Sequence, residues 1–184
     1  MSESCGDRFD AERAVLRRPA PRLRTAVFVA VALVCGAAGL AEAGTFRQGV
    51  AAFNRQQYLL AAQNFFPLAE QGDPAAQSYL GFMFETGRGV PRNYTEAAMW
   101  YRRAAEQGDS LAQYSLGLLY DRGFGVPRDI VEAAKWLNLA TAGAPPKARE
   151  TRARIRDAVT AKMTRGEIAQ ARLLALEWVP KRER

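Results

Sequence analysis

The sequence predicts an all-α protein built as a solenoid of stacked helix pairs. The first observation is internal repetition, since the stretch that begins at Asp73 begins again at Asp109, a period of 36 residues (109 minus 73). Repetition at a period of roughly 20–50 residues is typical of stacked repeat proteins. The second is helical spacing of small and apolar side chains, as at Ala76, Leu80 and Phe84. The third is a Gly-x-Gly-Val-Pro segment after each such stretch, where glycine can end a helix and proline cannot continue it.

Residues 1–43 have the organisation of a secretory signal peptide. An arginine-rich segment precedes an apolar stretch from Thr25 to Ala41, and Ala41-Glu42-Ala43 is a small-x-small cleavage site. We expect cleavage after Ala43 and export of the remaining chain. The alternative is an uncleaved membrane anchor through residues 26–41, although this stretch is short for a membrane span, which needs about 20 residues.

Residues 44–72 predict a shorter, degenerate helix pair. When this unit is aligned on the later ones, Gly49 takes the place of Gly81, and the Gly-x-Gly loop is absent. The segment Arg55-Gln56-Gln57 is therefore the predicted turn between its two helices. Pro67 falls inside the second helix and is expected to kink it or shift its register.

Residues 73–108 and 109–144 are predicted as two full repeats of two helices each. Asp73 before a proline is a helix start signal, because its side chain can accept a hydrogen bond from the first turn. Gly87 can take the left-handed conformation at the helix end. Gly81 in mid-helix is poor for helix propensity, which is tolerable if another helix must pack close at that point.

Residues 145–184 are predicted as C-terminal capping helices and a basic tail. The Gly143-Ala144-Pro145-Pro146 segment breaks the preceding helix. The next helix is expected over residues 147–163, and Thr164 with Glu167 forms a capping-box pattern that opens another. The terminal units of a solenoid need a polar outer face, and this pair has one.

The repeated pattern Ala76…Leu80-Gly81…Phe84…Gly87-x-Gly89-Val90…Glu96-Ala97…Trp100…Ala104 resembles the Sel-one-like repeat (SLR), a relative of the tetratricopeptide repeat. The same pattern recurs from Ala112 to Ala140. The resemblance implies a right-handed α/α superhelix that serves as a protein-interaction scaffold. It also implies that residues 44–72 are a degenerate tetratricopeptide-like repeat. The last helix pair is similar to the cap found after such repeats in exported bacterial members.

The residue types needed for most catalytic and metal sites are missing from the expected mature chain. The protein has no histidine, and its two cysteines, Cys5 and Cys35, both precede the predicted cleavage site. Histidine or cysteine metal sites and thiolate nucleophiles are thereby excluded after cleavage. The Gly87-Arg88-Gly89 and Gly123-Phe124-Gly125 loops lack the continuation of a phosphate-binding loop. We expect no cofactor.

The basic charge balance bears on possible partners. The chain carries a formal net charge of +7 at neutral pH. In the cytoplasm such a balance would raise nucleic-acid binding. For an exported chain we expect no nucleic acid, and the anionic partners available are lipid, lipopolysaccharide or another acidic envelope polymer. A solvated surface with no specific partner is the simpler interpretation.

A partner is expected on the concave side, which the first helix of each pair lines in this class of solenoid. At the positions offset from the core the two full repeats differ, as a binding face is free to do. Their large apolar side chains either bind a partner or are buried by the curvature and the C-terminal helices. Arg88 and Phe124 at the loop tips are second candidates. The candidate groove residues are Ser78, Phe82, Glu85, Tyr114, Leu118 and Asp121.

These observations lead to a non-enzymatic scaffold of the bacterial periplasm or envelope that binds an unknown protein or peptide. One alternative is binding or hydrolysis of a cell-wall polymer, for which Glu85 and Asp121 are the candidate carboxylates. Another is an envelope assembly factor that stays tethered to the inner membrane, with residues 1–24 in the cytoplasm.

Overall fold

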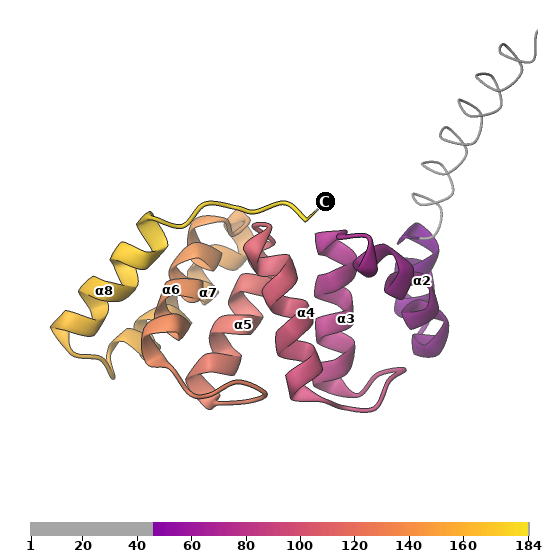
Figure 1. The fold of residues 1–184 in the computed structure, drawn as a ribbon, viewed down its shortest axis with the longest axis horizontal. Coiled ribbons are helices and arrows are strands. Elements are labelled where there is room, and N and C mark those ends of the chain that lie inside the picture. The colour runs from indigo at the N-terminus through magenta and orange to yellow at the C-terminus, as the bar shows by residue number, and fades with distance from the viewer. Residues whose placement is uncertain (1–45, 184) are drawn as a thin grey trace, which may run out of the picture. The chain divides into compact units, whose positions relative to one another are not determined.

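The computed structural model describes residues 46–183, where helices alternate with short loops and a tail follows the last helix (Figure 1). This arrangement confirms the predicted all-α repeat fold. The predicted signal peptide, its cleavage site after Ala43 and the alternative anchor through residues 26–41 lie outside the described residues. Within the described part, no helix combines the length and the hydrophobicity needed to cross a membrane. Residues 46–54 are helical and precede α2 (Tyr58–Glu70), α3 (Pro74–Thr86), α4 (Tyr94–Glu106), α5 (Ser110–Arg122), α6 (Ile130–Ala142), α7 (Pro146–Thr160) and α8 (Arg165–Leu176).

Polar side chains start the helices where the sequence predicts them. The Asp73 carboxylate accepts a hydrogen bond from the Ala76 amide at 2.7 Å, and Asp109 makes the equivalent bond at the start of α5. Thr164 and Glu167 form the predicted capping box at the start of α8. These bonds satisfy amides of the first turn that have no partner within the helix.

The first helix pair differs from the others at its turn and at its proline. Gln56 adopts a left-handed backbone conformation, with φ of 63°, in the predicted turn. Helix α2 then runs on through Pro67 to Glu70. Proline has no amide hydrogen, so the carbonyl of Gln63 lacks the hydrogen bond that residue 67 would otherwise donate. Gln63 and Pro67 are both exposed. Water can therefore satisfy the freed carbonyl, and the helix does not end at the proline.

In each of the first three pairs, a glycine of the first helix packs closely against a large side chain of the second helix. A Cβ added at Gly81 would lie 2.6 Å from a ring carbon of Tyr101, far inside normal contact distance. The mid-helix glycine is therefore required by packing, as the sequence suggests. The three facing combinations are Gly49 with Phe65, Gly81 with Tyr101 and Gly117 with Leu137.

The second glycine of each Gly-x-Gly loop packs against the backbone of the preceding helix pair. Gly89 has φ of 76°, and a Cβ there would lie 2.5 Å from the carbonyl of Tyr58 at the start of α2. Gly125 approaches Tyr94 at the start of α4 in the same way. A side chain at either position would be strained by the backbone conformation and would collide with the preceding pair. These loops are thus contacts between repeats as well as helix endings.

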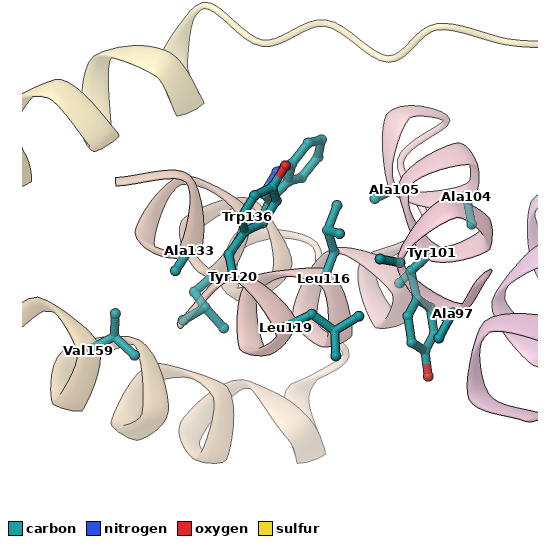
Figure 2. Close-up of a cluster of buried hydrophobic side chains, with 13 residues drawn as sticks. Ala97, Tyr101, Ala104, Ala105, Leu116, Leu119, Tyr120, Ala133, Trp136 and Val159 are labelled. Atoms are coloured by element: carbon teal, nitrogen blue, oxygen red, sulfur yellow. The ribbon is translucent and has the colours of Figure 1, made fainter. Parts of the chain in front are cut away.

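Two clusters of buried side chains form a core that runs through the stack. One joins residues 46–54, α2 and α3 with Trp100 of α4. The other joins α4, α5, α6 and α7, and Figure 2 shows its side chains meeting from these helices. Trp100 is 6% exposed and Trp136 is 4% exposed, so both fill the core.

The C-terminal helices continue the stack. Helix α7 begins at Pro146, 36 residues after Ser110 (146 minus 110), and Val159 joins the second core cluster. Helices α7 and α8 both pack against α6. The chain then turns back, and its tail runs past α6 and α4 toward α3 (Figure 1). Trp178 of the tail contacts the ring of Trp136 edge-on, with 6.3 Å between the centroids. Glu183 of the tail forms an ion pair with Arg103 at 2.6 Å.

Replacing Gly81 by alanine should lower the free energy of unfolding by about 1–3 kcal/mol, because overpacking against Tyr101 outweighs the roughly 1 kcal/mol gained in helix propensity. Urea unfolding followed by circular dichroism measures this change. Gly166→Ala is the matched control, since an added Cβ there meets no atom within 4 Å. We expect this control to be neutral or stabilising. A Gly81→Ala protein as stable as the parent would contradict the packing argument.

Acidification should release the tail from the helices. Hydrogen bonds from Arg103, and then from Gln77, lower the pKa of the Glu183 carboxyl below its ordinary value of 4.5. The other charged group acting on Arg103 is Glu70. Because the pKa is lowered in the folded state, the contribution of Glu183 is complete at neutral pH. It is lost as the pH falls below 4.5 and through the folded value.

The amide of Lys181 reports this release, because it donates to the carbonyl of Glu106 at 2.8 Å. Its protection factor in hydrogen exchange, measured by NMR, should fall on acidification. The Glu183→Gln protein should show low protection at every pH. Protection in the Glu183→Gln protein that equals that of the parent at neutral pH would contradict the assignment of the anchor to this carboxyl.

Candidate peptide-binding groove

The first helices of three successive pairs share one face, made by residues 46–54, α3 and α5, which we call the first-helix face. An apolar pocket of about 280 Å³ opens on it, between α3 and its two neighbours. The pocket is lined by Phe53, Ala75, Ser78, Tyr79, Phe82, Asp109 and Leu111.

Aromatic rings form the walls of the pocket and hold one another in place. Phe53 contacts Tyr79 and Phe82 edge-on, with centroid distances of 5.3 and 5.8 Å. Tyr79 and Phe82 are three residues apart on α3 and so lie on the same side of the helix. Tyr79 is also stacked on the buried ring of Phe65 at 4.7 Å. The walls are therefore built before any partner arrives, which lowers the entropy lost on binding.

One polar atom in the pocket lining has no partner. Ser78 is 4% exposed, and no group among residues 46–183 forms a hydrogen bond with its hydroxyl. Leaving a buried hydroxyl unpaired costs about 1–3 kcal/mol. The carboxylate of Asp109, in contrast, is engaged at the start of α5. Leu111 lies at the rim and is 53% exposed. The pocket thus offers apolar walls and an exposed apolar rim.

The predicted groove residues of α5 contact the C-terminal helix pair. The guanidinium of Arg152 lies over the ring of Tyr114, at 5.5 Å from its centroid. The ammonium of Lys162 is 3.2 Å from the carboxylate of Asp121. Leu118 is half-buried. This half of the first-helix face is therefore partly covered, whereas the half that carries Ser78 and Phe82 remains open.

Arg152 is a charged group buried at this covered end. It is 8% exposed, and its guanidinium donates to the carbonyls of Ser110 and Ala140, both at 3.0 Å. Burial lowers the pKa of Arg152, and the charge of Asp109 acts in the opposite direction. These bonds fasten α7 to the ends of α5 and α6.

Glu85 points into its own helix pair. Its carboxylate accepts a hydrogen bond from the hydroxyl of Tyr101 at 2.8 Å. Burial, followed by the charge of Glu85, raises the pKa of that tyrosine. Glu85 and Asp121 therefore contact different neighbours and do not form a carboxylate pair. Over the described residues, no three side chains of metal-ligating type gather into a possible metal site.

The loop-tip candidates pack against aromatic rings. Arg88 lies 5.3 Å from the ring centroids of both Tyr58 and Phe82. Phe124, which is 40% exposed, packs against Tyr94 at 4.9 Å. Arg88 thus extends the aromatic wall of the pocket, while Phe124 belongs to the contact between repeats.

Sequence reasoning missed five of the seven residues that line the pocket, which are Phe53, Ala75, Tyr79, Asp109 and Leu111. Tyr79 aligns with Ser115 and Leu111 aligns with Ala75, so both differ between the two full repeats. Ser78 was a candidate because it differs from its repeat equivalent Tyr114, and the same criterion would have identified Tyr79 and Leu111. Phe53 has no such signal, because it belongs to the degenerate first unit.

Solved structures of other proteins have the same fold. One is c5321, a protective antigen present in uropathogenic Escherichia coli strains that displays an SLR fold; it is 32% identical with a TM-score of 0.68, and the match covers 74% of this chain and 29% of that one. Another is a Sel1 repeat protein from Oxalobacter formigenes, 29% identical with a TM-score of 0.57, matched over 73% of this chain and 56% of its own. This chain thus spans less than two thirds of either relative. A search of curated proteins finds no match.

The repeats themselves match a known sequence family. The sequence model of the Sel1 repeat matches residues 74–109 and 110–143. These ranges contain α3 with α4 and α5 with α6, the two pairs that carry the full Gly-x-Gly loop. The fold and the repeats agree, and the chain belongs to the Sel1 repeat (SLR) family.

Proposed function

We propose that this chain is a non-enzymatic scaffold that binds a peptide segment of a partner protein on the first-helix face. The observation that carries the proposal is the preformed aromatic pocket with the exposed apolar rim at Leu111. Sel1 repeats are generally protein-interaction modules, and that role agrees with such a surface. The partner supplies an apolar side chain to the pocket.

The size of the pocket supports a peptide over a small metabolite. Ligand pockets for small molecules hold about 300–1,000 Å³ and bury most of the ligand. This pocket of about 280 Å³ lies between helices and is open to the exposed rim at Leu111. One large apolar side chain fits such a space, while the rest of the peptide lies along α3 and α5.

The hydrolytic alternative gains no support from the two candidate carboxylates. Glycoside hydrolases place two carboxyl groups on either side of the bond that they cleave. Here Glu85 bonds Tyr101 and Asp121 pairs with Lys162, so neither is free to face the other across a substrate. Binding of a cell-wall polymer without hydrolysis remains compatible with the basic charge of the chain.

The peptide proposal is tested with the rim residue Leu111, whose exposure allows substitution without loss of core packing. Peptides are first selected against the parent protein from a displayed library, and their affinities are measured by fluorescence anisotropy. Leu111→Asp should weaken binding at least about tenfold, because a charge at an apolar contact must be desolvated. Ser78→Ala should weaken it less.

The matched control is Leu173→Asp, because Leu173 on α8 is 54% exposed and Leu111 is 53% exposed. This control should bind the selected peptides as the parent does. Equal loss in both variants, or no loss in Leu111→Asp, would move the binding site away from the first-helix face.

We also propose that the chain is exported and acts in the periplasm. The basic segment, the apolar stretch and the Ala41-Glu42-Ala43 site support this proposal. N-terminal sequencing of the protein from its native envelope should find a chain that begins at Gly44. An intact Met1 in the membrane fraction would instead favour the tethered assembly factor anchored through residues 26–41.

A further inference from the structure

The tail lies on the helices in the way that an extended peptide lies in a binding site. It contacts the edge of the stack where α2 meets α3 and α4 meets α5, which we call the loop edge (Figure 1). Its contacts are an aromatic side chain, two backbone amides and a carboxylate. None of them requires the covalent connection to α8.

The carboxylate of Glu183 is held by a fork of donors. Arg103 donates through Nε at 2.9 Å to one oxygen and through Nη2 at 2.6 Å to the other. The Nε2 amide of Gln77 donates to the second oxygen at 2.8 Å. Such two-pronged pairing of arginine with a carboxylate adds geometric specificity to the attraction of charge. The site therefore selects an acidic side chain.

The donors of this fork are oriented by the protein itself. Gln77 is fully buried, and its amide also donates to the carbonyl of Ala69 at 3.0 Å. The Nε2 amide of Gln107 donates to the carbonyl of Gly72 and to Oε1 of Gln77, both at 2.9 Å. This leaves Oε1 of Gln107 to accept from the backbone amide of Glu183 at 3.4 Å. The network fixes both glutamines at the point where the tail binds.

The backbone of the tail approaches the loops closely because glycines stand there. The amide of Lys181 donates to the carbonyl of Glu106. A Cβ at Gly72 would lie 3.0 Å from the Cβ of Glu183, and one at Gly108 would lie 3.8 Å from the ring of Trp178. Both glycines have positive φ, which disfavours other residues, and at Gly72 the close approach of the tail disfavours them further.

The carboxylate fork occurs at one joint of the stack and is not a requirement of the repeat. Counting 36 residues onward, Arg103 is replaced by Leu139 and Gln107 by Gly143. The buried glutamine does recur, since Gln113 donates to the carbonyl of Ala105 at 3.2 Å, as Gln77 does at its own joint. The buried glutamine thus serves the fold, whereas Arg103 has no equivalent in the unit before it or after it and is an addition at the place where the tail binds.

We propose that the loop edge is a second binding site, for extended segments of a partner protein that carry an aromatic residue and a glutamate, and that the tail occupies it as an internal competitor. The tail defines the chemistry of the ligand. It carries a large aromatic side chain at Trp178, a proline two residues later and a glutamate three residues after that. Between these anchors Val179 is 69% exposed, as expected for a linear motif that binds through a few side chains. A partner segment with this pattern displaces the tail.

The test uses full-length protein and a fluorescein-labelled peptide with the sequence of residues 177–183. The tail is released in the double variant Trp178→Ala/Glu183→Gln, which removes the aromatic and acidic anchors. Its release is checked by the loss of Lys181 amide protection in hydrogen exchange. The labelled peptide should bind this variant at least tenfold more tightly than it binds the parent, whose own tail competes.

Two further variants locate the peptide on the loop edge. Arg103→Gln, added to the released variant, should abolish the gain in affinity, and so should a glutamine in place of the glutamate in the peptide. Arg55→Gln is the matched control on an exposed arginine of the first turn and should leave binding unchanged. Circular dichroism checks that each variant is folded.

A second measurement needs no variant. Excess unlabelled peptide added to the parent should lower the protection of its Lys181 amide, because the two segments compete for one site. The proposal is overturned if the tail is released and the peptide still binds no better than to the parent, since the tail is then a structural strap only. It is equally overturned if the Lys181 amide stays protected in the double variant. Neither result bears on the pocket of the first-helix face.

Discussion

The close contact between a glycine of one helix and a large side chain of the next is the constraint on which this fold depends. At Gly81 the ring of Tyr101 occupies the space that any Cβ would need, so the two helix axes come closer than ordinary side chains allow. The loop glycines do the same between pairs, where Gly89 meets the backbone of Tyr58. Contacts of these two kinds hold the helices of the first three pairs together.

The arrangement of the helices determines which surfaces are available for binding. First helices lie beside one another, so residues 46–54, α3 and α5 contribute to a single face, and the aromatic rings on it meet across helices. Helix α7 continues the stack beside α6 and places Arg152 over Tyr114. The stack therefore covers one end of the first-helix face and leaves the pocket at Phe82 open. The two ends of the first-helix face therefore differ, although the repeats are alike.

The joints between pairs provide the second surface. Buried glutamines bind carbonyls at the ends of preceding helices, because those carbonyls have no partner within their own helix. At one joint this polar network extends outward through Gln107 and Arg103 and binds the returning tail. The glutamine hydrogen bonds that join successive repeats are thus part of a carboxylate-binding site at this joint. The residues that bind the tail and those that line the pocket are different, so the two surfaces are separable by mutation.

The sequence alone determined the helical repeats, the starts of the helices at Asp73 and Asp109 and the need for a glycine at position 81, because these features arise from local spacing and backbone preference. It also placed Ser78 and Phe82 among the exposed-face candidates. Only the tertiary structure decided which rings close the pocket and where the tail lies. Phe53 joins the pocket through contact with another helix pair, and Glu183 reaches Gln77 across 106 residues. Contacts over such separations depend on the stacking of all the helices between, and no local pattern records them.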